Sequence, residues 1–479
     1  MRPPWLALTR TDLPLLAGGA FITVGAAAAS MRVGGIFSVG ALMAVALFFA
    51  SVAGFMAFPH LTIALMIPTF ALIPAIKVLA VPWIGPLKDL MTIAAITAAA
   101  ALVIQRAGEG NKQRGDAAAA ALVCFLVGLY LFNLGGRLEH DLAWSQGVRL
   151  ISEPVLLLLV GLALPQARRT LRWAMVSLAS TAVFVALTGI AQQAIGADRL
   201  VQMGYSYTLQ VRSIDDRLRS FGTMDESFAY AGFLLLGLVA LLVWYRRGIF
   251  TWIACPIILI GLAFAQVRTS VVILIALLGL WLARSQRPTV AAFFLATAAT
   301  TAAAILIWSS SGTETRTVRA GPSLFLTING RTDGWKIVLD SPRTWAVGKG
   351  VGEIGVAAER ATYSVSRRER KDKDASAVDS GYFALIADVG FIGLVVFLAL
   401  AARLIFLARK ATARGSNAGW LAIGFLAVML LDAVTRDSFT GFPTAFLGML
   451  LVGLALAAAD EEAENDRRSP PPAPATSTA

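Results

Sequence analysis

The sequence predicts an all-α fold, a polytopic transmembrane helical bundle. Hydrophobic residues make up 57% of the 479 residues and charged residues only 15%, and the mean hydropathy is +0.72, well above that of a soluble domain. Apolar runs of about 17 to 23 residues are long enough to cross the hydrocarbon layer of a bilayer as helices. Runs such as 231–244 and 391–402 are apolar on every face, which does not fit the alternating strands of a barrel.

We predict fourteen spans, with twelve to fourteen as the plausible range. They are residues 13–29, 36–58, 61–80, 90–105, 117–134, 150–164, 173–193, 228–244, 249–266, 270–283, 289–308, 382–403, 418–434 and 442–459. The first span is followed at once by others, so we expect a membrane anchor and not a cleaved signal peptide.

Basic residues orient the predicted bundle. With the N-terminus in the cytoplasm, the short inner loops from residue 106 onward are all basic, as the positive-inside rule requires. These loops hold Arg106, Lys112, Arg114, Arg168, Arg169, Arg172, Arg246, Arg247, Arg284, Arg287, Arg403, Arg409, Lys410 and Arg414. The opposite orientation would leave inner loops such as 81–88 nearly uncharged. We therefore expect both termini in the cytoplasm.

Four regions follow from this pattern. Residues 1–308 carry eleven spans and an outer loop near 194–227; residues 309–381 form a large, partly helical outer loop; residues 382–459 carry three spans; residues 460–479 form a tail. The tail is acidic and then proline-rich, a composition typical of disorder. Loops as long as the two outer ones are usually functional or disordered.

Composition excludes several classes of protein. The formal charge of +12 is not gathered into a basic stripe with interleaved aromatic residues on a soluble module. We therefore expect no nucleic-acid partner. Both cysteines, Cys124 and Cys255, lie inside predicted spans, and His60 and His140 are the two histidines. We therefore predict no disulfide framework, no protein-bound metal and no cofactor.

Three arginines stand where predicted spans meet outer loops. Arg219 precedes a span, Arg268 lies between two spans, and Arg331 opens a helical stretch of the large loop. Guanidinium groups bind phosphate oxygens in pairs and stay charged, so three of them at one membrane surface predict a diphosphate site. The alternative is interfacial snorkelling or ion pairing with neighbouring aspartates.

Five short motifs follow one another along the chain. They are RSFGT at 219–223, RTS at 268–270, RTDGW at 331–335, SPRTWAVGKGVG at 341–352 and DSGYFALIADVGFIGL at 379–394. Their order and spacing resemble the O-antigen ligase and Wzy-type polysaccharide polymerase superfamily of bacterial membrane glycosyltransferases. The resemblance covers the second half of the chain, and the first half only in its pattern of spans. It implies a metal-independent glycosyltransferase of the bacterial inner membrane, acting at the periplasmic face on glycans linked to undecaprenyl diphosphate.

The resemblance also assigns roles to residues. Arg219, Arg268 and Arg331 would hold the diphosphate, and Trp335 would pack the loop helix against the spans. Arg217 is a further candidate for substrate binding. Tyr382 could stack on a sugar, although an aromatic-belt anchor is the commoner role.

Asp379 marks a departure from the ligases of this superfamily. They carry a His-Asn pair where this sequence has Asp379 and Ser380, and this favours a polymerase. The Asp379 carboxylate could take a proton from the acceptor hydroxyl as general base. The alternative role is that of an N-cap on the following span.

We therefore predict a polymerase that transfers glycan from undecaprenyl diphosphate to a lipid-linked acceptor, for an exopolysaccharide or O-antigen. Transfer to lipid A core or protein, as by a ligase, and transport of an anion or small solute are the alternatives. Expected partners are the lipid-linked glycan and membrane lipid, with a chain-length regulator and a flippase as candidates. Asp388 and Asp432 lie inside predicted spans, where a carboxylate usually faces the bundle interior or a cavity.

Overall fold

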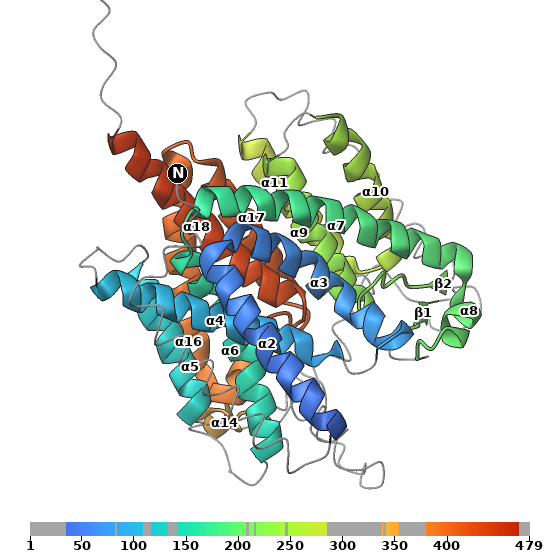
Figure 1. Cartoon of the computed structure of the whole chain (residues 1–479). Coiled ribbons are helices and arrows are strands. Elements are labelled where there is room, and N and C mark those ends of the chain that lie inside the picture. Colours follow the sequence, from blue (N-terminus) through green and yellow to red (C-terminus); the bar gives the residue numbers. More distant parts are fainter. Residues whose placement is uncertain are drawn as a thin grey trace, which may run out of the picture.

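The computed structural model describes ten stretches of the chain, which are residues 35–81, 84–108, 116–132, 141–206, 210–214, 217–244, 248–284, 338, 342–353 and 380–468. These stretches are almost wholly helical (Figure 1). The helices are α2 (Gly35–Ala57), α3 (Pro59–Leu79), α4 (Pro86–Gly108), α5 (Ala117–Phe132), α6 (Asp141–Ala163), α7 (Ala167–Ile195), α8 (Ala197–Gln202), α9 (Ser227–Trp244), α10 (Ile249–Ala265), α11 (Arg268–Arg284), α14 (Pro342–Val347), α16 (Gly381–Ala413), α17 (Asn417–Asp432) and α18 (Thr444–Arg468). Strands β1 (Ser213–Ile214) and β2 (Arg217–Leu218) pair antiparallel.

The helical membrane character predicted from the sequence is confirmed. Twelve of the fourteen predicted spans coincide with helices, while residues 13–29 and 289–308 lie outside the described residues. Seven helices are long and apolar enough to cross a membrane: α3, α4, α6, α7, α9, α16 and α18. Shorter apolar helices accompany them. The number of spans and their orientation stay predictions.

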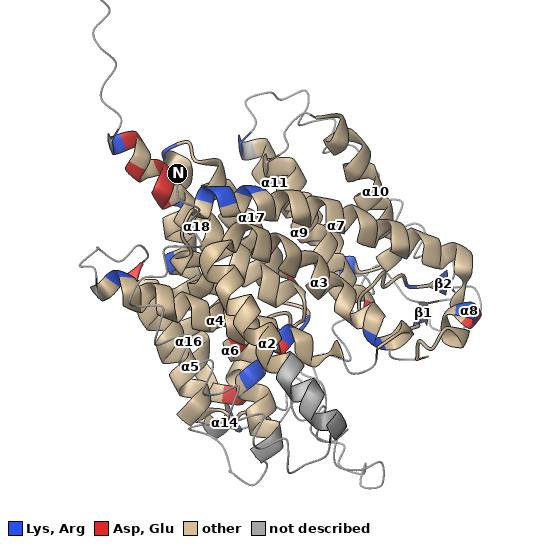
Figure 2. Ribbon diagram, viewed as in Figure 1, with Lys and Arg blue, Asp and Glu red and all other residues tan. Residues whose placement is uncertain are grey.

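One end of the bundle, which we call the basic-loop end, gathers the start of α7 and the ends of α11 and α18. Arg284 donates a hydrogen bond to the Val243 carbonyl oxygen at 2.9 Å. Arg168 lies 3.7 Å from the Glu462 carboxylate, to which the Ser416 hydroxyl also donates a hydrogen bond of 2.7 Å. Figure 2 shows basic residues (blue) and acidic residues (red) at this end, on the last turns of α18.

The tail prediction is wrong for its first nine residues, because α18 continues to Arg468. Two of the acidic side chains in this segment, Glu461 and Glu462, are held by the bundle. The Arg168 backbone N–H donates to Glu461 at 3.2 Å, in addition to the contacts of Glu462. Charge pairing and the continuing helix thus order a segment whose composition alone favours disorder. Residues 469–479 of the predicted tail lie outside the described residues.

The opposite end, which we call the site end, gathers α8, the β1–β2 hairpin and the first turns of α9, α11, α16 and α18. The hydroxyls of Thr269 and Thr435 lie 2.6 Å apart and join the start of α11 to the end of α17. Thr444 donates to the Ala229 carbonyl oxygen at 3.3 Å, which joins α18 to α9. Several helix N-termini, with their positive ends, therefore face this end.

Helix α18 runs through the middle of the bundle and packs on α6, α7 and α17 (Figure 1). Its closest crossing is with α6 and depends on two glycines. A Cβ at Gly161 would lie 2.3 Å from the Leu450 carbonyl oxygen, and a Cβ at Gly453 would lie 2.2 Å from that of Leu158. Small residues at such crossings let two membrane helices approach closely, where there is no hydrophobic driving force between them.

Helix α16 differs from the predicted span 382–403, because it continues to Ala413 and is interrupted at Gly390. Gly390 has φ 73° and ψ −172°, outside the helical region. A Cβ there would lie 2.4 Å from the Ala346 carbonyl oxygen of α14. Glycine therefore lets the described segment 342–353 of the large loop dock against the break.

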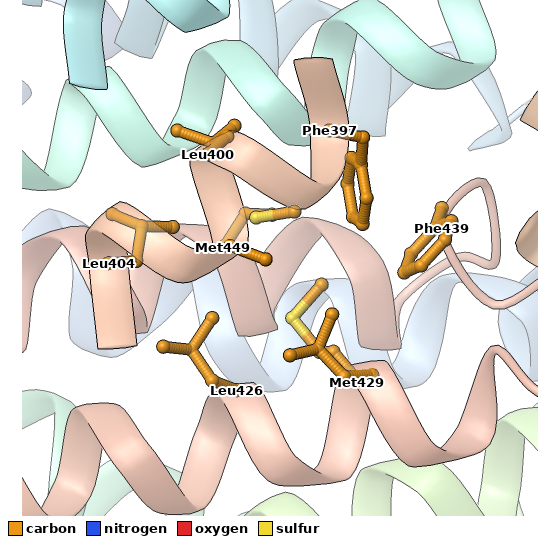
Figure 3. A pocket seen from close by; sticks show the side chains of 9 residues that line it. Phe397, Leu400, Leu404, Leu426, Met429, Phe439 and Met449 are labelled. Atoms are coloured by element: carbon orange, nitrogen blue, oxygen red, sulfur yellow. The ribbon is translucent and has the colours of Figure 1, made fainter. Parts of the chain in front are cut away.

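The interior beside the rest of α16 is apolar. A small cavity between α16, α17 and α18 is lined by Phe397, Leu400, Ala401, Leu404, Leu426, Met429, Leu430, Phe439 and Met449 (Figure 3). These side chains offer no acid, base or cation, so the cavity carries no chemistry of its own. Polar groups gather at both ends of the bundle, and the motif residues that the structure describes near Arg219 lie at the site end.

Candidate functional site

The RSFGT segment at the site end is fixed by a buried glutamine of α7. Gln192 accepts hydrogen bonds from the backbone N–H groups of Phe221 and Gly222, at 3.0 and 2.9 Å, through its side-chain oxygen. Its amide nitrogen donates to the Gly222 carbonyl oxygen at 2.7 Å. One side chain thereby satisfies three backbone groups that would otherwise be buried without partners.

The two hydroxyl residues of the motif also bond to neighbouring backbone. Ser220 donates from its hydroxyl to the Gly189 carbonyl oxygen at 2.6 Å, and its backbone N–H bonds to Phe264 at 2.9 Å. Thr223 donates to the carbonyl oxygen of Ala71, in α3, at 2.7 Å. These bonds tie the segment to α7, α10 and α3. The motif residues around Arg219 therefore position it.

Gly222 is required by conformation and by space. Its φ of +57° lies in the left-handed region, which favours glycine. A Cβ at this position would also lie 2.7 Å from the Tyr230 ring and 3.0 Å from the Val185 carbonyl oxygen. The glycine of the motif therefore lets the segment turn closely over α7 and α9.

Replacing Gln192 by methionine is expected to destabilise the protein by at least about 2 kcal/mol, because buried backbone groups lose their partners. The segment that carries Arg219 would then no longer be fixed. Thermal unfolding of the purified protein measures the destabilisation. Ser180→Ala is the control, because the Ser180 hydroxyl is exposed and bonds within its own helix. An unchanged melting temperature for Gln192→Met would contradict the prediction.

The β1–β2 hairpin places arginines opposite one another. Ser213 pairs with Leu218, and the Arg219 N–H bonds to the Arg212 carbonyl oxygen at 2.9 Å, so Arg212 and Arg219 are the next opposed pair. Residues directly opposite on antiparallel strands project to the same face. Leu218 is buried, so the arginines project away from its side. Arg217 lies on that same face of β2, two residues from Arg219.

Arg219 reaches back over the start of α9. Its Nε donates to the Ala265 carbonyl oxygen at 3.3 Å, and its guanidinium carbon lies 4.9 Å from the centre of the Phe228 ring. Among the described residues, no carboxylate forms an ion pair with it. Burial and the like charge of Arg212, with a smaller effect of Arg268, lower the pKa of Arg219 to about 10, and the nearby Glu226 carboxylate offsets part of this lowering. It stays protonated at neutral pH, with its charge compensated only in part.

Arg268 stands beside this group as the first residue of α11. It is exposed, and it is close enough to Arg219 for its charge to lower the pKa of that guanidinium. The positive end of the α11 dipole adds to the same region. Two of the arginines predicted to converge thus lie near each other.

Arg436, which the sequence analysis did not single out, is a further arginine of this region. It is buried, with Nε 3.3 Å from Asp432 and Nη1 3.8 Å from Glu226. Its guanidinium carbon lies 5.8 Å from the Phe228 ring centre, on which Arg219 also packs. No hydrogen-bond partner for its Nη1 occurs in the described part of the chain. We call Arg212, Arg219, Arg268 and Arg436 the arginine cluster.

A signal for Arg436 was present in the sequence. Asp432 was recognised as a carboxylate in a span, and Arg436 follows it at the i,i+4 spacing that allows ion pairing on a helix. The cluster's net positive charge could hold an anion. Within the described ranges, no group of three His, Cys, Asp or Glu residues could hold a metal ion.

The other predicted site residues divide into two sets. Asp379, Arg331 and Trp335 lie outside the described residues. Tyr382 donates its hydroxyl to the Leu430 carbonyl oxygen at 2.9 Å and packs edge-on against Phe439 at 5.3 Å. These contacts give Tyr382 a packing role between α16 and α17.

Ser380, the residue after Asp379, packs against the turn after α17 that contains Arg436. Its hydroxyl donates to the Ala433 carbonyl oxygen at 3.1 Å, and the Gly381 N–H bonds to the carbonyl oxygens of Ala433 and Arg436 at 2.9 Å. The end of the large loop therefore returns to the bundle next to the arginine cluster.

Asp388, the other carboxylate predicted to face the interior, lies at the break in α16. It accepts a hydrogen bond from the Tyr130 hydroxyl at 3.1 Å and one from the Gly352 backbone N–H. The Lys349 N–H bonds to the Ala387 carbonyl oxygen at 2.7 Å. Asp388 thus helps to hold segment 342–353 of the large loop against α16.

No protein-family model and no curated protein matches the chain. The resemblance to the ligase and polymerase superfamily therefore depends on the motifs alone. What the structure adds is the placement of their described residues, above all Arg219 and Arg268, at one end of an apolar bundle.

Proposed function

We propose that the chain is a membrane glycosyltransferase that polymerises lipid-linked polysaccharide repeat units. The observation that carries this proposal is Arg219, a partly buried guanidinium without an ion pair among the described residues, beside Arg212, Arg268 and Arg436. A buried cation next to like charges is stabilised by a bound anion. Its place at the end of an apolar bundle suits an anion that is attached to a membrane lipid.

Undecaprenyl diphosphate joined to a glycan is such an anion. In the proposed reaction an acceptor hydroxyl oxygen forms a bond to the anomeric carbon of the donor glycan. The bond from that carbon to the diphosphate oxygen breaks, and undecaprenyl diphosphate leaves with the electron pair. The arginine cluster stabilises the negative charge that develops on the leaving group.

The hydroxyl proton must pass to a base, and Asp379 is the proposed acceptor of that proton. Support comes from Ser380 and Gly381, which hydrogen bond to the turn that carries Arg436. The basic-loop end would face the cytoplasm by the positive-inside rule, with Arg168, Arg169 and Arg172 in the first turns of α7. The arginine cluster would then face the periplasm across the bacterial inner membrane.

A deletion strain distinguishes the proposed reaction from its alternatives. If the chain polymerises, membranes without it should accumulate single lipid-linked repeat units, and a plasmid copy should restore long chains. Lipid extraction followed by mass spectrometry measures the species. Accumulation of long lipid-linked chains would instead indicate a ligase. Unchanged glycans together with lost uptake of an anion or small solute would indicate a transporter and would overturn the proposal.

A further inference from the structure

Four charged side chains of α4 and α6 form a second polar centre at the site end, which we call the α4–α6 ion network. Lys88 pairs with Asp89, its neighbour in sequence, and lies 3.9 Å from Glu153. Arg149 lies 3.4 Å from Asp89 and 3.6 Å from Glu153. Charged residues inside apolar helices usually face the bundle interior or a water-filled cavity, and they usually mark function.

The polar surface extends along one face of α6. Ser145, Arg149 and Ser152 follow the i, i+4, i+7 spacing that places side chains on the same helix face. Ser152 is 8% exposed, and neither its hydroxyl nor the Arg149 Nε–H has a hydrogen-bond partner in the described ranges. Pro154 lies inside α6 and has no N–H to donate to the preceding turn. Buried polar groups without partners are costly, so this face suits bound hydroxyl groups.

The network and the arginine cluster are separated by the turn that leads into α18. The Lys88 ammonium lies 5.4 Å from the centre of the Phe442 ring. The preceding residue, Gly441, abuts Arg436, because a Cβ there would lie 2.6 Å from Nη2. Two consecutive residues, Gly441 and Phe442, thus link the two polar centres.

The two centres differ in charge. The arginine cluster consists of four cations, of which Arg436 pairs with Asp432 and Glu226. The α4–α6 ion network contains two cations and two carboxylates. A balanced set offers both hydrogen-bond donors and acceptors, as the hydroxyl groups of a sugar require. Side-chain exposure falls from 35% at Arg149 to 20% at Asp89 and 8% at Glu153, so the polar surface leads from the outside of the bundle inward.

We propose that the α4–α6 ion network binds the hydroxyl groups of the acceptor sugar while the arginine cluster binds the donor diphosphate. This inference rests on the proposed function, since it assigns the second substrate of the same transfer. The turn at 437–443 would then lie between acceptor and donor.

Binding of two separate probes tests the assignment. One probe is the repeat-unit oligosaccharide released from its lipid by mild acid, and the other is undecaprenyl diphosphate. Both are titrated into the full chain in detergent, with saturation-transfer NMR for the saccharide and thermal shift for the lipid. Arg149→Gln should weaken saccharide binding about tenfold, the effect of losing a charged hydrogen-bond donor, and should leave lipid binding unchanged. Arg219→Gln should do the reverse.

Ser152→Ala is the second variant, because it removes a hydroxyl without touching an ion pair. It should weaken saccharide binding by a few-fold and leave the melting temperature unchanged. Wild-type saccharide binding in both Arg149→Gln and Ser152→Ala, or no saccharide binding by the unmodified chain, would overturn the inference. Undecaprenyl diphosphate binding that survives Arg219→Gln would overturn the proposed diphosphate site instead, so the two failures are distinguishable.

Discussion

Arg219→Gln is expected to abolish glycan elongation and to leave the protein at least as stable as the wild type. The pKa of Arg219 in the folded chain is about 10, below its ordinary value of 12.5. At neutral pH the protonated guanidinium therefore costs folding free energy, and this cost is lost only as the pH rises through about 10. A neutral glutamine removes it. Removing a group that stabilises developing charge typically lowers the rate by about 100-fold or more.

Elongation is measured in membranes with lipid-linked repeat units, and stability by thermal unfolding of the purified protein. Undecaprenyl diphosphate should raise the melting temperature of the wild type but not of Arg219→Gln, because a ligand stabilises only the fold that binds it. Arg199→Gln is the matched control, since Arg199 is exposed on α8 at the same end. Elongation at the wild-type rate in Arg219→Gln would remove this residue from the site.

Arg436→Gln is expected to lose both stability and activity, in contrast to Arg219→Gln. Arg436 is paired with the buried carboxylate of Asp432 at 3.3 Å and lies 3.8 Å from Glu226. Breaking a buried pair by removing one partner leaves an uncompensated charge and costs about 3–5 kcal/mol. The double variant Asp432→Asn/Arg436→Gln removes both charges, so most of the lost stability should return.

Activity should not return in the double variant, because the cation that would face the diphosphate is still missing. Thermal unfolding and elongation are measured on the same membrane preparations. Recovery of both stability and elongation would show that Arg436 only packs against Asp432. Recovery of neither would show that the pair is needed for folding in itself.

The motif residues illustrate how far local sequence reaches. RSFGT was recognised because an arginine precedes a span. The structure explains why the other residues of the motif are of these types. Ser220 and Thr223 bond to neighbouring backbone, and Gly222 has a positive φ. Their partners come from α7, α3 and α10, so they could not be read from the motif itself.

Arg436 is a site residue that could not be assigned to the arginine cluster from the sequence around it. Its i,i+4 spacing from Asp432 was visible, but nothing along the chain connects it to Arg219, more than two hundred residues earlier. The Phe228 ring, packed by both guanidinium groups, makes that connection in the fold. The α4–α6 ion network is a similar case, because its charges come from two helices and balance only when those helices pack together.

The sequence by itself determined the helical membrane character, because the lengths and polarity of its apolar runs fix where a helix can cross a bilayer. It also placed arginines at the junctions of spans and loops. The tertiary structure alone decided which arginines are neighbours, that residues 460–468 continue α18, and that α16 breaks at Gly390 to receive the large loop. The physical reason is that the spacing of apolar residues is a property of one segment, whereas burial and charge compensation depend on segments far apart in the chain.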